Sequence, residues 1–380
     1  MLTYNSTYPI GLDISELSLK LVQLNKSGEK IRVQALGKID LPDGCFQNGE
    51  INNRQAVLGA LKKLIANPKF GKITSDEVIA CLPETRTFVK LIEVERADNL
   101  EEAVKLELEK HVPMAMDEIF FDWQVMAELP DRFFILAGAA PKAIVNQYTD
   151  FLKEARLSVV ALEIEPISLC RSLLNEEHPK FKGKYEKNYG IIDIGAKRTN
   201  MTIYSKNTIL FTISIPISGE EITKNIAEAL EIEESQAEKA KIICGLDEKK
   251  AQGVIKNILS GEIEDLNKKI GEAIDFYENH FPGRGPLDKI ILCGGGANIK
   301  NLDKIINKAV SIGTTMGDDL INLGEAKEKF SKILEETHSL NLDLTGKKEK
   351  KKPITITQDS SLSFATAIGL ALRGVFIDEL

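Results

Sequence analysis

The stretch that decides the fold is residues 189–204, YGIIDIGAKRTNMTIY. An apolar run ends in Asp193, a glycine follows at Gly195, and an alternating run then extends from Thr199 to Tyr204. This pattern predicts a strand, a tight turn and a second strand. Because a carboxylate is rarely buried unless it is paired or binds a cation, Asp193 at the tip of an apolar hairpin indicates a binding site.

A second hairpin of the same kind lies near the start of the chain. Residues 10–24, IGLDISELSLKLVQL, again close an apolar strand with an Asp-Ile pair, and the acid is Asp13. A repeat on this scale predicts a duplicated domain. The backbone N–H groups of each turn can form an anion-binding nest, and each aspartate can hold a hydrated divalent cation. The alternative is that each aspartate only accepts hydrogen bonds from its own turn.

A third element strengthens the ligand-binding interpretation. Residues 290–302, IILCGGGANIKNL, predict a strand, a turn of three glycines and a helix. Glycines allow a close approach of the backbone to a ligand, and the N-terminus of the following helix favours anions. Two acidic hairpins that face each other would hold a polyphosphate and its Mg²⁺ from both sides, with the glycine turn beside them.

The composition excludes several other classes of protein. The chain has 380 residues, enough for two or more domains, and its net charge of −8 gives no general nucleic-acid footprint. Five widely spaced cysteines without a CxxC pair, and four histidines, argue against a disulfide framework or a zinc site. We find no signal peptide and no apolar run long enough to span a membrane.

The order of the predicted elements suggests how the domains are arranged. Between residues 82 and 157 the pattern of strand, helix, two strands and helix predicts a small α+β insertion. We therefore predict an α/β fold of two duplicated domains around a nucleotide cleft. The first domain would comprise residues 8–81 and 158–187, with the insertion at 82–157; the second would comprise 188–217 and 286–380, with a helical lobe at 218–285.

The two hairpins and the glycine turn together resemble the phosphate 1, phosphate 2 and adenosine motifs of the actin-like ATPase superfamily. That superfamily includes actin, the sugar kinases, the heat-shock chaperone ATPases and the division protein FtsA. The resemblance implies ATP and Mg²⁺ as cofactors, with the metal at Asp13 and Asp193. The nucleotide contacts that it implies are Asp13, Ser15, Glu16, Ser18 and Lys20, then Asp193, Gly195, Ala196, Lys197, Thr199 and Gly219, and finally Gly294, Gly295, Gly296, Ala297 and Asn298.

Two further sites follow from the same resemblance. Residues 237–241, AEKAK, resemble the family helix whose Glu and Lys, here Glu238 and Lys241, contact ribose and adenine; the alternative is an ordinary i,i+3 surface ion pair. Glu165 before Pro166 resembles the Glu-Pro of the chaperones' catalytic site, or is simply an acid at a helix start. We assign no catalytic residue, and we expect ATP hydrolysis to be weak or absent.

A closer resemblance, to the PilM family of type IV pilus assembly proteins, covers Pro9 to Gly374. The segment that discriminates best is residues 111–125, HVPMAMDEIFFDWQV. This resemblance implies a cytoplasmic ATP-binding scaffold at the inner face of the membrane. It would bind the N-terminal cytosolic tail of a PilN-like single-span membrane protein, without inserting into the membrane or binding nucleic acid. Pilus motor ATPases and further copies of the chain are additional candidate partners.

The chain departs from the family pattern at both hairpins. Ser15 and Glu16 stand where a glycine and a serine are usual, and Lys197 and Arg198 stand where small residues are usual. The two cations either contact phosphate or point to solvent. The alternatives to a pilus scaffold are an FtsA-like division protein, and a phosphotransferase or ATPase on the same fold. The C-terminal end LALRGVFIDEL lacks the basic face of a membrane-binding helix.

The predicted insertion offers a place for the membrane protein's tail. Residues 119–126, IFFDWQVM, combine aromatic and flexible apolar side chains, which suit a groove for an extended apolar peptide. The alternative is a strand buried on both faces within the insertion. Five lysines within residues 347–352 predict a hydrated loop or, alternatively, a contact with anionic lipid.

Overall fold

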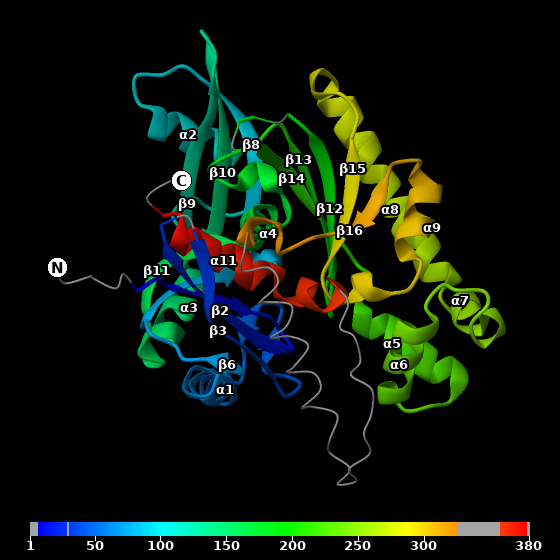
Figure 1. Ribbon diagram of the computed structural model, residues 1–380. Helices are drawn as coiled ribbons and strands as arrows, with labels where there is room; N and C mark the ends of the chain where they lie inside the picture. Colours follow the sequence, from blue (N-terminus) through cyan, green and yellow to red (C-terminus); the bar gives the residue numbers. More distant parts are fainter. Residues whose placement is uncertain (1–6, 29, 182, 185, 325–357, 378–380) are drawn as a thin grey trace. The chain divides into compact units, whose positions relative to one another are not determined.

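The computed structural model describes residues 7–28, 30–181, 183–184, 186–324 and 358–377 (Figure 1). The chain divides into two compact units. The first unit comprises Met1–Lys182 and Asp318–Leu380, and the second comprises Gly183–Gly317. The lysine-rich run at 347–352 lies outside the described residues.

The first unit is built on a six-stranded sheet in the order β11-β7-β1-β2-β3-β6. The first predicted hairpin forms its centre, with β1 antiparallel to β2 and Asp13 opposite Lys20. Strands β7 and β11 run parallel on the other side of β1. The bounds are β1 (Ile10–Ile14), β2 (Ser18–Ser27), β3 (Lys30–Asp40), β6 (Phe70–Gly71), β7 (Glu77–Leu82) and β11 (Ser158–Ile164). A short hairpin of β4 (Phe46–Gln47) and β5 (Glu50–Ile51) stands apart from this sheet.

Helices bury apolar side chains on this sheet. Helices α1 (Arg54–Ala66) and α3 (Lys142–Glu154) share one core with β1. Helix α4 (Glu165–Leu173) packs closely on α11 (Ala365–Val375), and α11 in turn lies on β1 and β2. A Cβ at Gly11 would lie 2.3 Å from the carbonyl oxygen of Ala367, so the close approach of α11 to β1 requires a glycine there.

The place of α11 corrects one predicted domain boundary. We assigned residues 286–380 to the second domain, but the described part of the C-terminal segment belongs to the first unit (Figure 1). Helix α11 is buried along most of its length, and apolar residues all around a helix do not reveal which sheet covers it. The close packing of Gly11 and Gly369 against their neighbours is what assigns α11 to the sheet of the first unit.

The insertion is an antiparallel sheet covered by one helix. Its strands lie in the order β8-β10-β9, and α2 (Leu100–Glu109) packs on one face through Val104 and Leu108. The strand bounds are β8 (Phe88–Glu95), β9 (Ile119–Glu128) and β10 (Arg132–Pro141). The predicted range of 82–157 is too long at its C-terminal end. Helix α3 puts Ile144, Tyr148 and Phe151 into the core of the first sheet and not into the insertion.

The second unit repeats the strand arrangement of the first. Its strands lie in the order β16-β15-β12-β13-β14, with β12, β13 and β14 antiparallel and β15 parallel to β12. The predicted hairpin at 189–204 is therefore confirmed as β12 and β13. The bounds are β12 (Asn188–Ile194), β13 (Thr199–Ser205), β14 (Thr208–Ile215), β15 (Lys289–Cys293) and β16 (Thr314–Met316).

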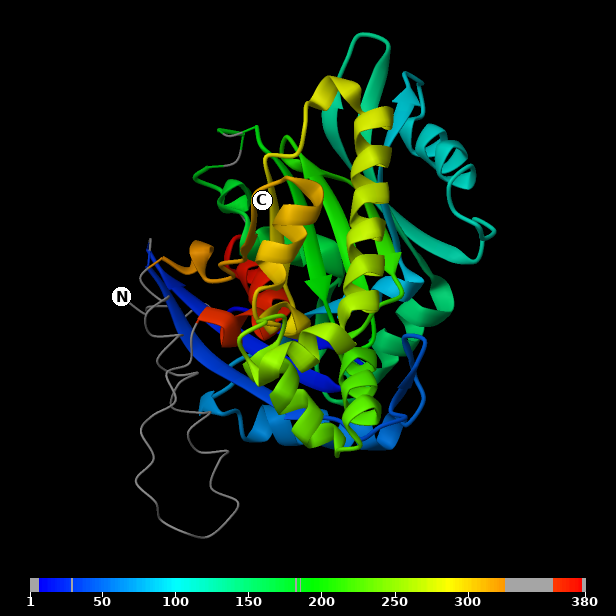
Figure 2. The same ribbon diagram turned by 90° about the vertical axis from the view of Figure 1, so that its right-hand side faces the viewer.

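Helices of the second unit follow its hairpin and its glycine turn. They are α5 (Gly219–Leu230), α6 (Glu234–Cys244), α7 (Val254–Ile258), α8 (Ser260–His280) and α9 (Leu302–Val310). Figure 2 shows the long helix α8 lying along the green strands of this unit, with Ile263, Leu266 and Ile270 among its buried side chains. Within the described residues, no helix has the length and apolar character needed to cross a membrane.

Candidate functional site

The first hairpin surrounds its aspartate with protein donors. Asp13 is 3% exposed, and the ammonium Nζ of Lys20 donates to its Oδ2 at 2.7 Å. The hydroxyl of Ser15 donates to the other oxygen, Oδ1, at 2.7 Å. The turn itself closes through the N–H of Ser15, which donates to the carbonyl oxygen of Ser18 at 3.1 Å. Asp13, Ser15 and Lys20 therefore lie together within the first unit, and their contact with a nucleotide remains a prediction.

A cysteine on the neighbouring parallel strand completes this group. The thiol of Cys81 on β7 lies 3.9 Å from Oδ1 of Asp13. Burial raises the pKa of Cys81 well above its ordinary value, and the negative charges of Asp13 and Glu165 raise it further. Cys81 is therefore a protonated thiol that can donate weakly to Asp13.

This arrangement bears on the predicted metal site. Direct coordination of Mg²⁺ by Asp13 does not fit, because Lys20 already brings a positive charge to the carboxylate, and its oxygens also accept from Ser15 and Cys81. Among the described residues there is no group of three or more His, Cys, Asp or Glu side chains that could hold a metal ion. The prediction that remains is that Asp13 and Asp193 hold Mg²⁺ through its water ligands.

The second hairpin has the same turn. The N–H of Gly195 donates to the carbonyl oxygen of Arg198 at 2.8 Å, which matches the bond from Ser15 to Ser18. Asp193 lies opposite Asn200 on β13 and opposite Cys293 on the parallel strand β15.

The glycine turn that follows β15 packs directly against this hairpin. Gly294 has φ of +77°, and a Cβ there would lie 2.1 Å from Oδ1 of Asp193. A Cβ at Gly296 would lie 2.2 Å from the side chain of Ile194, whereas a Cβ at Gly295 would meet no atom within 4 Å. The side-chain oxygen Oδ1 of Asn298 is buried without a hydrogen-bond partner. An unpaired acceptor beside an exposed glycine fits a ligand that brings a donor, as an adenine amino group does.

Helix α5 begins against the turn of the second hairpin. The N–H groups of Gly219 and Glu220 donate to the carbonyl oxygens of Gly195 and Ala196, both at 3.0 Å. Lys197 forms an ion pair with Glu220, and hydrogen bonds from Lys197 and Lys224 lower the pKa of that glutamate. In this structure Lys197 pairs with an acid of α5, and its contact with phosphate remains a prediction.

The predicted pair Glu238 and Lys241 has two different roles. Lys241 is buried and donates to the carbonyl oxygen of Gly219 at 2.9 Å and to the hydroxyl of Thr223 at 2.8 Å, so it ties α6 to α5. Glu238 lies 2.5 Å from Lys241, and 47% of its side chain is exposed. A simple surface ion pair is therefore excluded for Lys241, and Glu238 is the member that a ligand can reach.

The predicted site residues thus fall into two groups. Asp13, Ser15 and Lys20 come together in the first unit, with Glu16 half-buried and Ser18 buried in the same turn. The second unit brings its members together around the β12–β13 turn, and they are Asp193, Gly195, Ala196, Lys197, Thr199, Gly219, Gly294, Gly295, Gly296, Ala297 and Asn298, with Glu238 and Lys241 on α6. That both groups contact one ligand remains a prediction.

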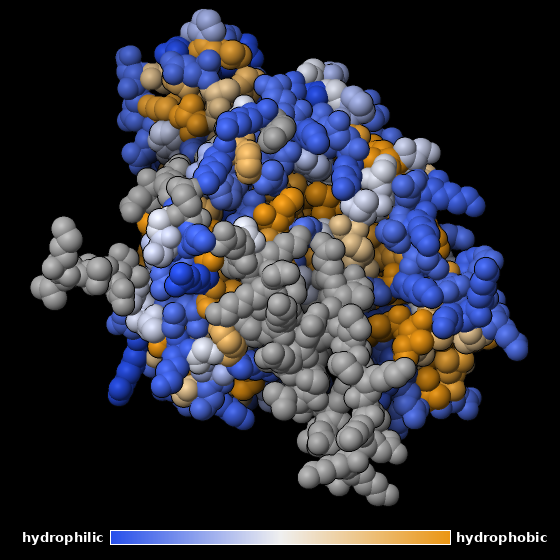
Figure 3. Space-filling model, in the orientation of Figure 1, coloured by the Kyte–Doolittle hydropathy of each residue, from blue (hydrophilic) through white to orange (hydrophobic). Residues whose placement is uncertain are grey.

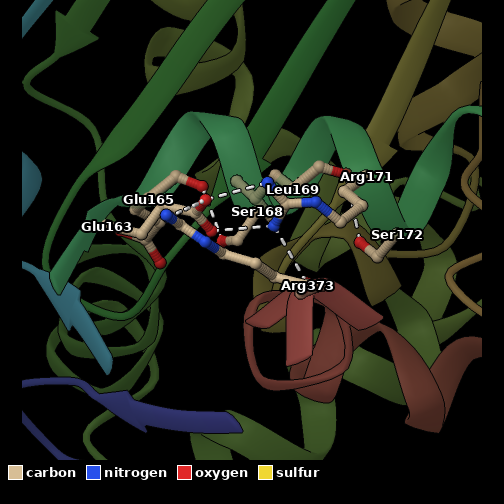
Figure 4. Close-up of polar contacts among 8 residues, drawn as sticks. Glu163, Glu165, Ser168, Leu169, Arg171, Ser172 and Arg373 are labelled. Atoms are coloured by element: carbon tan, nitrogen blue, oxygen red, sulfur yellow. Dashed lines mark hydrogen bonds and ion pairs between the residues drawn. The ribbon is translucent and has the colours of Figure 1, made fainter. Parts of the chain in front are cut away.

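The sequence did not reveal a buried ion network in the first unit (Figure 4). Glu163 accepts two hydrogen bonds from Arg171, both at 2.8 Å, and one from Arg373 at 2.7 Å. Burial acts to raise the pKa of Glu163, but the two arginines outweigh it and hold the pKa below its ordinary value. The network ties β11 and α4 to α11, which begins 200 residues later in the chain than Glu165.

The same contact region includes Glu165, the acid that resembles a chaperone catalytic residue. It stands at the first position of α4, and its Oε1 accepts from the hydroxyl of Thr366 on α11 at 3.0 Å. Its charge contributes to the raised pKa of Cys81, the thiol that lies 3.9 Å from Oδ1 of Asp13. No local pattern in the sequence signals these partners, because they come from distant segments.

A family model described as type IV pilus assembly protein PilM matches residues 11–375 of the chain. Among curated proteins, the cell division protein FtsA of Enterococcus hirae is 23% identical over 301 residues, 73% of this chain and 61% of that protein. FtsA of Streptococcus pneumoniae is 24% identical over 353 residues, 80% of this chain and 73% of that protein. The chain thus spans less than two thirds of the first of these relatives.

Solved structures show the fold. A structure described as a PilM-PilN type IV pilus biogenesis complex aligns with a TM-score of 0.76 and 21% identity, over 97% of this chain and 98% of that chain. The ethanolamine utilization protein EutJ from Carboxydothermus hydrogenoformans aligns with a TM-score of 0.54 and 14% identity, over 97% of this chain and 90% of that chain. MreB5 of Spiroplasma citri bound to AMPPNP aligns with a TM-score of 0.50 and 17% identity, over 89% of this chain and 98% of that chain. The predicted actin-like α/β fold is confirmed.

Proposed function

Because the chain belongs to the type IV pilus assembly protein PilM family, we propose that it is a nucleotide-binding scaffold of a type IV pilus or a related secretion or competence machine. It acts at the inner face of the cytoplasmic membrane by binding the N-terminal cytosolic tail of a PilN-like single-span membrane protein. The observation that carries the proposal is the match over residues 11–375, which includes the insertion as well as both hairpins.

Nucleotide is the first part of the proposal. A neighbour of the same fold is described as bound to AMPPNP. In this chain, supporting features are the glycine turn against Asp193, the unpaired acceptor on Asn298 and the half-exposed Glu238. ATP would place adenine near the glycine turn and Glu238. Lys20 and the two hairpin turns would contact its phosphates, and bound Mg²⁺ would neutralise phosphate charge.

Calorimetry with ATP tests the nucleotide part. The wild-type chain should bind, and Asn298→Ala should weaken binding because the acceptor is lost. Asn257→Ala is the matched control, because Asn257 is an exposed asparagine at the end of the short helix α7. Equal binding by all three proteins would exclude the assigned role of the glycine turn.

The partner is the second part, and the junction of the insertion with the first sheet supports it. Phe120 at the start of β9 is 47% exposed, and Lys142 lies over its ring at 5.5 Å. Val160 on β11 is 39% exposed, and β11 ends the first sheet. A Cβ at Gly138 of β10 would lie 2.8 Å from Ile164, so the insertion meets β11 closely here. Exposed apolar side chains beside a sheet edge suit an extended apolar tail.

The test uses the full chain, because the structure shows that deleting residues 82–157 would remove α3 from the core of the first sheet. A fluorescent peptide with the tail sequence of the PilN-like protein encoded by the same organism is titrated into the wild type and into Phe120→Ala and Val160→Ser. Both variants should bind more weakly. Val254→Ser, an exposed valine of α7, is the control. A peptide that binds the junction variants as well as the wild type would place the tail elsewhere.

A further inference from the structure

The insertion carries nearly all of the net charge of the chain. Residues 88–141 contain twelve Asp and Glu and five Lys and Arg, a net charge of −7, whereas the whole chain has −8. The remaining residues are therefore almost neutral in total. Such a concentration of one sign creates a local field that attracts cationic partners and repels anionic ones.

The outer strand of the insertion is also the end of its sheet. Strand β9 pairs with β10 on one side, and in the described part of the chain no strand follows it in the sheet order. It has 10 residues, longer than most strands that proteins leave at an edge. An edge of this length presents backbone N–H and C=O groups to which a further strand can bind.

An acidic and an apolar side chain lie on the two faces of this edge. Asp122 and Val125 on β9 are exposed, Val125 at 39%, and so is Leu129 just beyond the strand, at 41%. Glu128 is also exposed, but it forms an ion pair with Arg96.

The register with β10 puts Asp122 opposite Gly138 and Val125 opposite Ile135, so these two side chains lie on opposite faces of the sheet. The N–H of Trp123 donates to Oδ1 of Asp122 at 2.9 Å, which holds that carboxylate against the backbone of β9. A partner strand beside β9 would therefore meet the carboxylate of Asp122 at the level of its own side chains. Figure 3 shows apolar side chains among hydrophilic ones over the insertion at the upper left.

We infer that the β9 edge binds an extended, lysine- or arginine-rich segment of a further protein, which adds to the insertion as an additional strand. Its backbone would pair with β9, its cations would face Asp122, and its apolar residues would cover Val125 and Leu129 on the other face. A second copy of this chain is disfavoured at the same edge, because it would bring a second insertion of net charge −7 against the first. This partner is separate from the membrane protein's tail at Phe120 and Val160.

The experiment uses the full chain and a short fluorescein-labelled peptide in which lysine alternates with valine and threonine. Fluorescence anisotropy gives its affinity at low salt. The charge reversal Asp122→Lys should weaken binding about tenfold or more, because an attractive pair becomes repulsive. Asp122→Asn keeps an acceptor for the N–H of Trp123 and removes only the charge, so it should give a smaller loss. The same peptide with glutamate in place of lysine should not bind.

Hydrogen exchange then locates the peptide. Bound peptide should slow the exchange of amides within residues 122–128 and leave those of α2 unchanged. Protection elsewhere, or equal affinity for the charge-reversed variant, would overturn the inference. A concentration-dependent dimer that protects the same amides would overturn it in favour of a second copy. The membrane protein's tail should bind the charge-reversed variant with unchanged affinity; a parallel loss would mean that the two ligands share one site and would also overturn it.

Discussion

The β1–β2 and β12–β13 hairpins share one backbone and differ in chemistry. Each places an aspartate at the end of its first strand and closes the turn with the same N–H to C=O bond. Each also has a cysteine on the parallel neighbouring strand, Cys81 beside Asp13 and Cys293 opposite Asp193. Opposite the aspartate, however, the first hairpin has Lys20 and the second has Asn200.

This difference separates two ways to stabilise a carboxylate at a hairpin tip. The first hairpin supplies its own buried cation. The second hairpin has Asn200 at that position, and its turn contacts α5 on one side and the glycine turn on the other. A duplicated backbone therefore does not imply a duplicated binding chemistry, because burial and charge depend on side chains that the turn geometry leaves free.

The largest effect should come from removing the buried cation. Lys20→Met leaves Asp13 buried with no ammonium partner, and we expect the free energy of unfolding to fall by about 3 to 5 kcal/mol. Asn200→Met, at the matching position of the second hairpin, should cost far less because no buried charge loses its partner. Denaturant unfolding of both variants measures the difference. Equal losses would show that the two hairpins are stabilised alike.

Acid should weaken the first unit before the second. Arg171 and Arg373 lower the folded pKa of Glu163 below its ordinary value of 4.5, so its stabilising contribution is complete above that value and is lost as the pH falls through the lowered pKa. Hydrogen exchange followed from neutral pH downwards should show β11 and α11 opening before β12 and β13. In Arg373→Gln the loss should begin at higher pH. Simultaneous opening of both units would contradict this.

Replacing glycine by alanine in the glycine turn should lower the stability of the protein at Gly294 but not at Gly295. Gly294→Ala forces a Cβ against Asp193 at a positive φ, and we expect a loss of about 1 to 3 kcal/mol in the free energy of unfolding. Gly295→Ala meets no neighbour, so its stability should stay within about 0.5 kcal/mol of the wild type. Thermal unfolding measures both. If Gly295→Ala keeps its stability but binds ATP less tightly, the turn contacts the nucleotide.

The smallest effect should come from the exposed lysine of the second hairpin. Lys197 pairs with Glu220 at the surface, so Lys197→Ala should change the free energy of unfolding by about 0.5 kcal/mol or less. ATP affinity measured on the same variant distinguishes its two predicted roles. A loss comparable to that of Lys20→Met would mean that Lys197 contacts phosphate in the complex.

Much of the fold was readable from the sequence. The alternating runs around Asp13 and Asp193 predicted both hairpins, and their repetition predicted a duplicated domain. The resemblance of the hairpins and the glycine turn to the superfamily motifs implied the actin-like fold that the solved structures confirm. The segment HVPMAMDEIFFDWQV indicated the PilM family, which the match over residues 11–375 confirms. Such patterns are local: they follow from which residues alternate along a strand and which ones permit a turn.

Only the tertiary structure decided where α3 and α11 belong and which groups surround each aspartate. Helix α11 contacts β1 across more than 350 residues of chain, and it contacts Arg171 and Glu165 through atoms that no local pattern relates. The contrast between Lys20, a buried partner of Asp13, and Lys197, a surface partner of Glu220, arises in the same way. The sequence determines the charge of each side chain and the spacing between charged residues. The burial of a side chain depends on which segments pack against it, and these segments lie far away in the chain.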